Sequence, residues 1–222
     1  MRFLHPFRIG LIMAVVALCA PGQRIPDKDA PANEVKGVPP RATAGDYQAH
    51  GAAGTLTVGA EFLGHSIPRP TGSPITTDEY VVVEIGLFGP PEARLKISAE
   101  DFSLRINDKK APTPSQPFGM VFRSLKDPDW SPPVPAEPKS KTGINTGGQG
   151  GQGDAPAPVH MPFELQRAIQ QHVRKVAIAE GDRALPQAGF IFFPYRGKVE
   201  SIHSMELTYA GPAGKVMLTL EP

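Results

Sequence analysis

The chain has 222 residues, enough for one sizeable domain or two small ones, and its 23 basic and 22 acidic residues give a net charge of +1. This balance favours no polyanion, and the sequence lacks the basic patch or stripe typical of nucleic-acid-binding domains, so we expect no nucleic-acid partner. The 26 Pro and 23 Gly together exceed a fifth of the chain, and they concentrate in particular segments.

The N-terminus has the pattern of a secretory signal peptide, which we predict over residues 1–22. Arg2, His5 and Arg8 form a basic start, and an apolar run at 9–18 follows it. The run is shorter than the roughly 20 residues of an ordinary membrane-spanning helix. The sequence therefore predicts an exported protein, periplasmic or extracellular. The alternative is a retained anchor or an N-terminal core helix.

Cys19 is the only cysteine, and it lies inside the predicted signal segment. In a lipoprotein it could carry a lipid, but the bulky Leu18 before it is a poor match to the small residue that lipid attachment requires. Cleavage after Gly22 would leave a mature chain without thiols, and hence without disulfides or thiolate metal sites. Membrane contact is expected only if the N-terminal segment is retained or Cys19 is lipidated.

Two segments are predicted to be disordered. Residues 23–53 contain many Pro, Gly and Ala residues and few large apolar ones, so they cannot bury enough surface to offset their ordering entropy. Residues 131–160 are a second Pro/Gly-rich stretch, which we interpret as a flexible loop. So long a loop is unusual inside a domain and would also suit two separate halves.

Before this loop the chain has the patterns of β-strands. Residues 55–62 alternate between apolar and polar side chains, which is typical of a half-buried strand, and the nearly continuous apolar run at 80–88 suits a central strand. Further strands are predicted at 94–98, 102–106 and 118–125.

After the loop the sequence predicts a helix over 163–180 and then three more strands. Pro162 suits the start of a helix, the apolar residues recur three to four apart, and Gly181 is a plausible cap at the C-terminal end. The strands are expected at 190–193, 205–209 and 216–220, the last two joined as a hairpin by Gly211–Gly214.

About eight short strands separated by turn residues indicate a β-sandwich. Strands with apolar faces occur on both sides of the 131–160 loop, and neither set alone could close a core. We therefore predict one mostly β domain over 54–222, an antiparallel β-sandwich interrupted by the disordered loop and with one inserted helix. The helix either caps an open end of the sandwich or lies on one sheet.

Two segments resemble the telokin-like immunoglobulin domains of bacterial exported proteins. In one, the valine-rich strand at 80–85 precedes an aromatic-x-Leu strand at 101–105 and the polar turn Asn107-Asp108. In the other, 188–192, a Gly precedes alternating large apolar residues. The resemblance implies an immunoglobulin-like sandwich and an extracytoplasmic location, but no activity. The long loop and the helix depart from the family pattern.

His203 and Met205 form a His-x-Met pair on a predicted strand. The two-residue period of a strand would place both side chains on one face, where an imidazole and a thioether could hold Cu(I). Periplasmic copper handling is thus the alternative function. The simpler interpretation is that Met205 is a core residue and His203 lies at the strand end.

Two loops are further candidates for binding. Asp127 and Asp129 lie around a turn and could hold Ca²⁺, although that ion takes six to eight oxygen ligands, so we prefer a loop that docks Trp130 at the domain edge. Tyr195 and Arg196 follow a very apolar strand and are residue types frequent in interface hot spots. We select Tyr195, Arg196 and Trp130 as candidate interaction residues.

The sequence predicts no catalytic residues, because it contains no nucleophile motif, phosphate-binding loop or paired-carboxylate pattern. It also predicts no cofactor. We expect an exported, non-catalytic module that binds a protein or a cell-envelope component through exposed loops or a sheet edge. A hydrolase whose site residues are scattered along the sequence is the remaining alternative.

Overall fold

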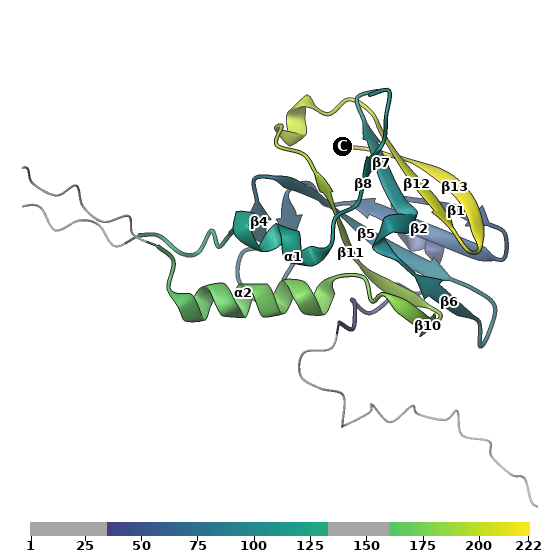
Figure 1. The fold of residues 1–222 in the computed structure, drawn as a ribbon, viewed down its shortest axis with the longest axis horizontal. Coiled ribbons are helices and arrows are strands. Elements are labelled where there is room, and N and C mark those ends of the chain that lie inside the picture. The colour runs from purple at the N-terminus through teal and green to yellow at the C-terminus, as the bar shows by residue number, and fades with distance from the viewer. Residues whose placement is uncertain (1–34, 133–159) are drawn as a thin grey trace, which may run out of the picture. The chain divides into compact units, whose positions relative to one another are not determined.

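The computed structural model describes residues 35–132 and 160–222 (Figure 1). The predicted signal peptide, Cys19, the first part of the predicted leader and almost all of the Pro/Gly-rich loop lie outside the described residues. The structure is mostly β, and all of its described residues belong to one compact unit.

Two four-stranded antiparallel sheets pack face to face. The central sheet has the order β1 (Ala49–Ala53), β2 (Leu56–Phe62), β5 (Tyr80–Phe88), β11 (Gln187–Pro194). The outer sheet has the order β13 (Gly214–Leu220), β12 (Met205–Gly211), β7 (Phe102–Ile106), β8 (Thr113–Pro114). The alternating apolar side chains of both sheets meet in one interior, as the strand pattern led us to expect.

Segments from both sides of the Pro/Gly-rich loop build each sheet. β11 pairs along its whole length with residues 80–87 of β5, and β7 pairs with β12. The predicted strands at 55–62, 80–88, 94–98, 102–106, 190–193, 205–209 and 216–220 are all present, and the last hairpin turns at Gly211–Gly214. Strand β6 (Arg94–Ile97) pairs with β10 (Gly181–Ala184) in a separate two-stranded sheet.

A third layer covers part of the other face of the central sheet. It contains helix α2 (Phe163–Val176), the short helix α1 (Phe118–Val121) and a small sheet of β3 (Ser66–Ile67), β4 (Ile75–Thr77) and β9 (Leu125–Lys126). Ile169 and Val173 of α2 pack in one apolar cluster with Val82 of β5 and with Phe190 and Phe192 of β11. The helix therefore lies on a sheet, which was one of the two placements expected.

The chain leaves α2 four residues earlier than predicted. Ala177 is extended, and the Ile178 amide donates to the Phe190 carbonyl, 3.0 Å away, so this segment runs along the edge of β11. Gly181 has a φ of 92° but begins β10, so its predicted role as the helix cap is wrong. Pairing with β11 satisfies backbone groups that one more helical turn would otherwise satisfy.

Three segments together cover the edge of β11. Besides Ile178, the amide of Val38 donates to the Ala188 carbonyl at 2.9 Å, and the amide of Gln116 donates to Phe192 at 2.8 Å. An uncovered strand edge can pair with another chain. This edge is occupied, so the predicted use of a sheet edge for binding is not available at β11.

Two predictions of local structure are wrong. Residues 118–125 form α1, a 3₁₀ turn at Phe122–Ser124 and only then β9; Phe118, Val121, Phe122 and Leu125 in fact follow a helical spacing. The predicted disordered leader extends too far, because residues 49–53 form β1. That strand, Ala-His-Gly-Ala-Ala, lacks an apolar alternation, and it is ordered by pairing with β2.

Candidate functional site

The loop after β11 holds Tyr195 and Arg196 in intramolecular contacts. The Tyr195 ring stacks on His65, with ring centres 6.1 Å apart, and its hydroxyl lies 2.8 Å from Ser201 Oγ. Arg196 has a side chain that is 79% exposed, yet its Nη2 lies 2.7 Å from Glu79 Oε1. Tyr195 is thus part of the scaffold, and the charge of Arg196 is matched within the chain.

The Asp127–Trp130 turn is bound by an arginine. Arg69 donates to both carboxylate oxygens of Asp127 at 2.9 Å, and its Nη2 also donates to Asp129 at 2.5 Å. These hydrogen bonds from Arg69 lower the pKa of the buried Asp127 carboxyl. Trp130 is half-buried, and its amide donates to the Asp127 carbonyl. Arg69 already pairs with both carboxylates, so the Asp127–Trp130 turn fastens the 68–73 loop to the domain. We call this contact the clamp at Asp127.

The structure does not bring His203 and Met205 together. Met205 begins β12 and is fully buried in the interior between the two sheets. His203 is exposed and precedes the strand, where its amide donates to Asn107 Oδ1 at 2.7 Å. The prediction that both side chains share one strand face is therefore wrong, because the strand begins only at Met205.

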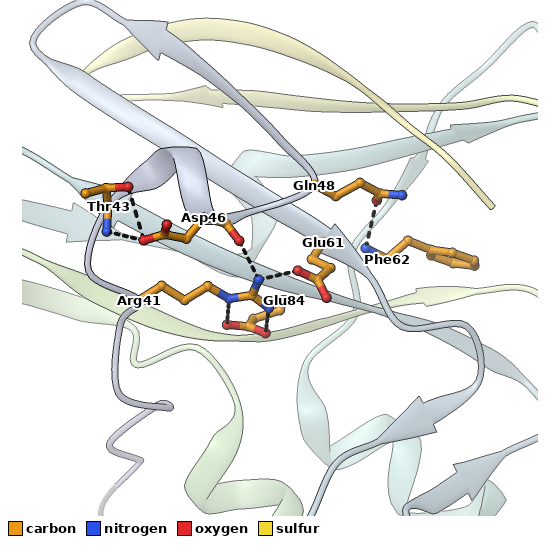
Figure 2. A network of polar contacts seen from close by, with 7 residues as sticks. All are labelled: Arg41, Thr43, Asp46, Gln48, Glu61, Phe62 and Glu84. Carbon is orange, nitrogen blue, oxygen red and sulfur yellow. Dashed lines mark hydrogen bonds and ion pairs between the residues drawn. The ribbon is translucent and has the colours of Figure 1, made fainter.

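A network around Arg41 fastens the N-terminal segment to the central sheet (Figure 2). Glu61 of β2 and Glu84 of β5 are directly opposite each other across the strands, a placement in which like charges repel. Arg41 pairs with both carboxylates, at 2.8 Å for Glu84, and donates to the Asp46 carbonyl at 2.7 Å. It also lies over the Tyr47 ring, 4.5 Å from its centre.

Tyr47 lies on a floor of glycines beside this network. Gly59 of β2 and Gly86 of β5 are opposite each other, and a Cβ there would lie 2.6 Å and 2.5 Å from Tyr47 ring carbons. The absence of side chains at both positions lets the ring pack on the sheet, where it is 4% exposed. Burial raises the pKa of Tyr47. The contacts of Arg41 and Tyr47 therefore stabilise the fold, and we assign them a structural role.

A groove between α2 and the segment 122–125 has a different character. It has a volume of about 290 Å³ and is lined by Phe122, Arg123, Leu125, Met161, Gln166, Ile169 and Gln170. We call it the helix groove. Two of the most exposed large apolar side chains lie on the neighbouring helices: Met120 of α1, the helix just before residues 122–125, is 58% exposed, and Phe163 of α2 is 71% exposed. Exposed apolar side chains beside a groove are typical of a binding surface.

Three arginines at or beside the helix groove have no carboxylate partner among the residues that the structure describes. Elsewhere in the described part of the chain, arginines form ion pairs: Arg41 with Glu84, Arg69 with Asp127, Arg94 with Asp182, Arg105 with Glu206 and Arg196 with Glu79. Arg183 donates to the Glu180 carbonyl. Within residues 35–132 and 160–222, Arg123, Arg167 and Arg174 form no ion pair, and we call these three the basic rim.

Helical spacing explains how the rim lies beside the groove. Phe163, Arg167, Gln170 and Arg174 are three to four residues apart, so they form one stripe along α2, adjacent to the groove residue Gln166. Arg123 projects from the opposite wall. Arg174 lies in the last turn, where a cation also interacts favourably with the helix dipole, but this does not account for Arg167 in the middle of the helix.

Sequence reasoning missed this site. The three-to-four spacing predicts the apolar stripe of α2, and the same spacing places Phe163, Arg167 and Arg174 in a second stripe on the neighbouring face. The other wall could not have been found, because residues 118–125 were interpreted as a strand.

In the part of the chain that the structure describes, no three His, Cys, Asp or Glu side chains are placed to hold a metal ion together. Across these same residues, no helix has the length and apolar character needed to cross a membrane. The chain matches no protein-family model, and no curated protein or solved structure is significantly similar to it.

Proposed function

We propose that the chain is an exported, non-catalytic β-sandwich module that binds a protein of the cell envelope or its surroundings through the helix groove. The observation that carries this proposal is that the groove lies beside the exposed Phe163 and three arginines that form no ion pair within residues 35–132 and 160–222. An isolated exposed arginine is ordinary, but unpaired arginines gathered beside exposed apolar surface are typical of interaction sites.

The site differs in position from the loops that the sequence suggested. Tyr195, Arg196 and Trp130 take part in contacts within the chain. The hollow beside Tyr195 is larger, about 440 Å³, but Glu79 in its lining already neutralises Arg196, which leaves Lys109 as its one cation without an ion pair among the described residues. The helix groove therefore offers more unmatched charge to a partner.

The immunoglobulin-like relation stays a prediction. Its support is the pair of antiparallel sheets packed face to face and the final hairpin of β12 and β13. The strand order differs from the immunoglobulin pattern, in which strands A, B, E and D form one sheet and C, F and G the other, so the third strand changes sheets. Here β1, β2 and β5 follow one another within one sheet. We therefore derive the function from the surface, not from the family.

Site-specific photo-crosslinking in the native cell tests the proposal. A photoreactive residue replaces Gln170 in the helix groove, and in a control it replaces the exposed Thr219 on the outer face of β13. We expect a discrete adduct from position 170 alone. The adduct should weaken when Arg167→Glu is added, but not when the exposed Lys215→Glu is added. Equal adducts from both positions, or none from position 170, would contradict the proposal.

A further inference from the structure

We infer that the partner segment which occupies the helix groove is an acidic amphipathic helix. This inference rests on the proposed function and names the chemistry of the partner. Its starting point is the composition of the site. Phe122, Leu125, Met161 and Ile169 line the groove together with Gln166, Gln170 and Arg123, and Arg167 and Arg174 line the adjoining hollow on α2, which shares both glutamines with the groove. A ligand that contacts the apolar lining and also pairs with the arginines must carry apolar and anionic side chains at fixed spacing.

The apolar side chains that line the groove would contact the apolar face of such a helix. Aromatic, aliphatic and thioether side chains line the same hollow, and methionine adapts readily to the shape of a neighbouring side chain. A helix lying along α2 would insert the apolar residues of its i, i+3, i+4, i+7 stripe. Exposed Phe163 at the start of α2 extends the apolar contact beyond the groove itself.

The basic rim would form ion pairs with acidic side chains on the two flanks of the partner helix. Arg167 and Arg174 are seven residues apart on α2, which corresponds to about 10.5 Å along the helix axis. Carboxylates seven residues apart on a parallel or antiparallel helix have the same spacing. Arg123, on the opposite wall, would meet a carboxylate on the other flank. One helix can therefore match all three cations and fill the groove.

The charges around the groove favour an anionic partner over a neutral one. The only acidic residue of α2 is Glu164, against Arg167, Arg174 and Lys175, and Arg123 adds a further cation across the groove. An anionic lipid surface would also attract these cations, but a flat surface would leave the apolar hollow unfilled. The combination of a concave apolar lining and a basic rim fits a peptide better.

Fluorescence anisotropy with defined peptides and the full chain tests the inference. The probe is a labelled peptide of roughly two heptads, with Leu on one face and Glu at seven-residue intervals on both flanks. One control peptide has the same composition in scrambled order, and a second has Lys in place of every Glu. Vesicles containing anionic lipid are tested in parallel.

We expect the acidic peptide to bind, the scrambled peptide to bind at least about tenfold more weakly and the Lys peptide not to bind. Arg167→Glu combined with Arg174→Gln should weaken the acidic peptide at least about tenfold and permit binding of the Lys peptide. The matched control is Lys198→Glu combined with Lys215→Gln, two exposed lysines away from the groove, and it should change neither affinity. Thermal unfolding confirms that both variants fold.

Equal binding of the acidic and scrambled peptides would overturn the inference, because it would indicate charge attraction without a shaped site. Binding of anionic vesicles but not of the peptide would overturn it in favour of a lipid surface. If no peptide bound while position 170 still formed a specific crosslink in cells, the groove would keep its binding role and only the partner chemistry would be wrong.

Discussion

The Arg41 network and the basic rim use the same residue type in opposite ways. Arg41 contacts two carboxylates, a carbonyl and an aromatic ring, and it compensates a repulsion between Glu61 and Glu84. Arg167, across the described part of the chain, has no ion pair. The comparison indicates that removing Arg41 should cost stability, whereas removing Arg167 should cost binding.

The largest expected effect on stability comes from Gly59 and Gly86, the two glycines on which Tyr47 packs. Gly86→Ala would place a Cβ 2.5 Å from a Tyr47 ring carbon, so the ring must move off the sheet. We expect the free energy of unfolding to fall by about 3 kcal/mol, measured by urea denaturation. Gly119→Ala is the matched control, because a Cβ there meets nothing within 4 Å. Equal losses in the two variants would show that Tyr47 does not depend on the floor.

The clamp at Asp127 is expected to give the next largest effect. Asp127→Asn removes the charge that binds Arg69 and should lower the stability at pH 7 by about 2 kcal/mol. Since the pKa of Asp127 is lowered in the folded state, its contribution is present above the unfolded pKa of about 3.9 and disappears as the pH falls through the folded pKa.

Chemical denaturation of wild type and Asp127→Asn between pH 7 and pH 2 measures this dependence. The difference in stability should be constant from about pH 7 to 5 and should shrink below about pH 4. A difference that persists unchanged at pH 2 would mean that the lost contact is not the ion pair with Arg69.

Removing Arg41 should have a smaller effect on stability, and a second substitution or added salt should reverse part of it. Arg41→Met removes the guanidinium group, which lies over the Tyr47 ring, and leaves Glu61 and Glu84 facing each other, so we expect a loss of about 1 kcal/mol in the free energy of unfolding. The loss should shrink when Glu61→Gln is added, and also at high salt. If Glu61→Gln gave no recovery, the repulsion between the two carboxylates would not be the cause.

The smallest expected effect on stability belongs to the rim. Arg167→Gln should change the free energy of unfolding by less than about 0.5 kcal/mol, because the exposed side chain has no ion pair among the described residues. The same variant should reduce the crosslink from position 170. Arg196→Gln, which removes an exposed but paired arginine, is the control for the crosslink. A large loss of stability in Arg167→Gln would remove the contrast with Arg41.

Much of the fold could be predicted from local patterns. The strands β2, β7 and β12 alternate between apolar and polar residues, and β5 is apolar almost throughout because both of its faces are covered. Strand β1 could not be predicted, because its small residues give no periodic signal and its pairing with β2 decides its conformation. The strand predicted at 118–125 was wrong, because the apolar run there suits a helix as well as a strand.

The candidate site depended still more on tertiary contacts. Local sequence patterns were enough to place most of the strands of the two large sheets, an amphipathic helix after Pro162 and the arginines on that helix. Which arginines pair with carboxylates depended on the folded chain, because Arg41 and Glu84, like Arg69 and Asp127, are brought together by strands and loops far apart in the sequence. Charge pairing over such separations follows from how the sheets and the covering layer pack. This packing leaves Arg123 in the helix groove and Arg167 and Arg174 in the hollow that adjoins it on α2.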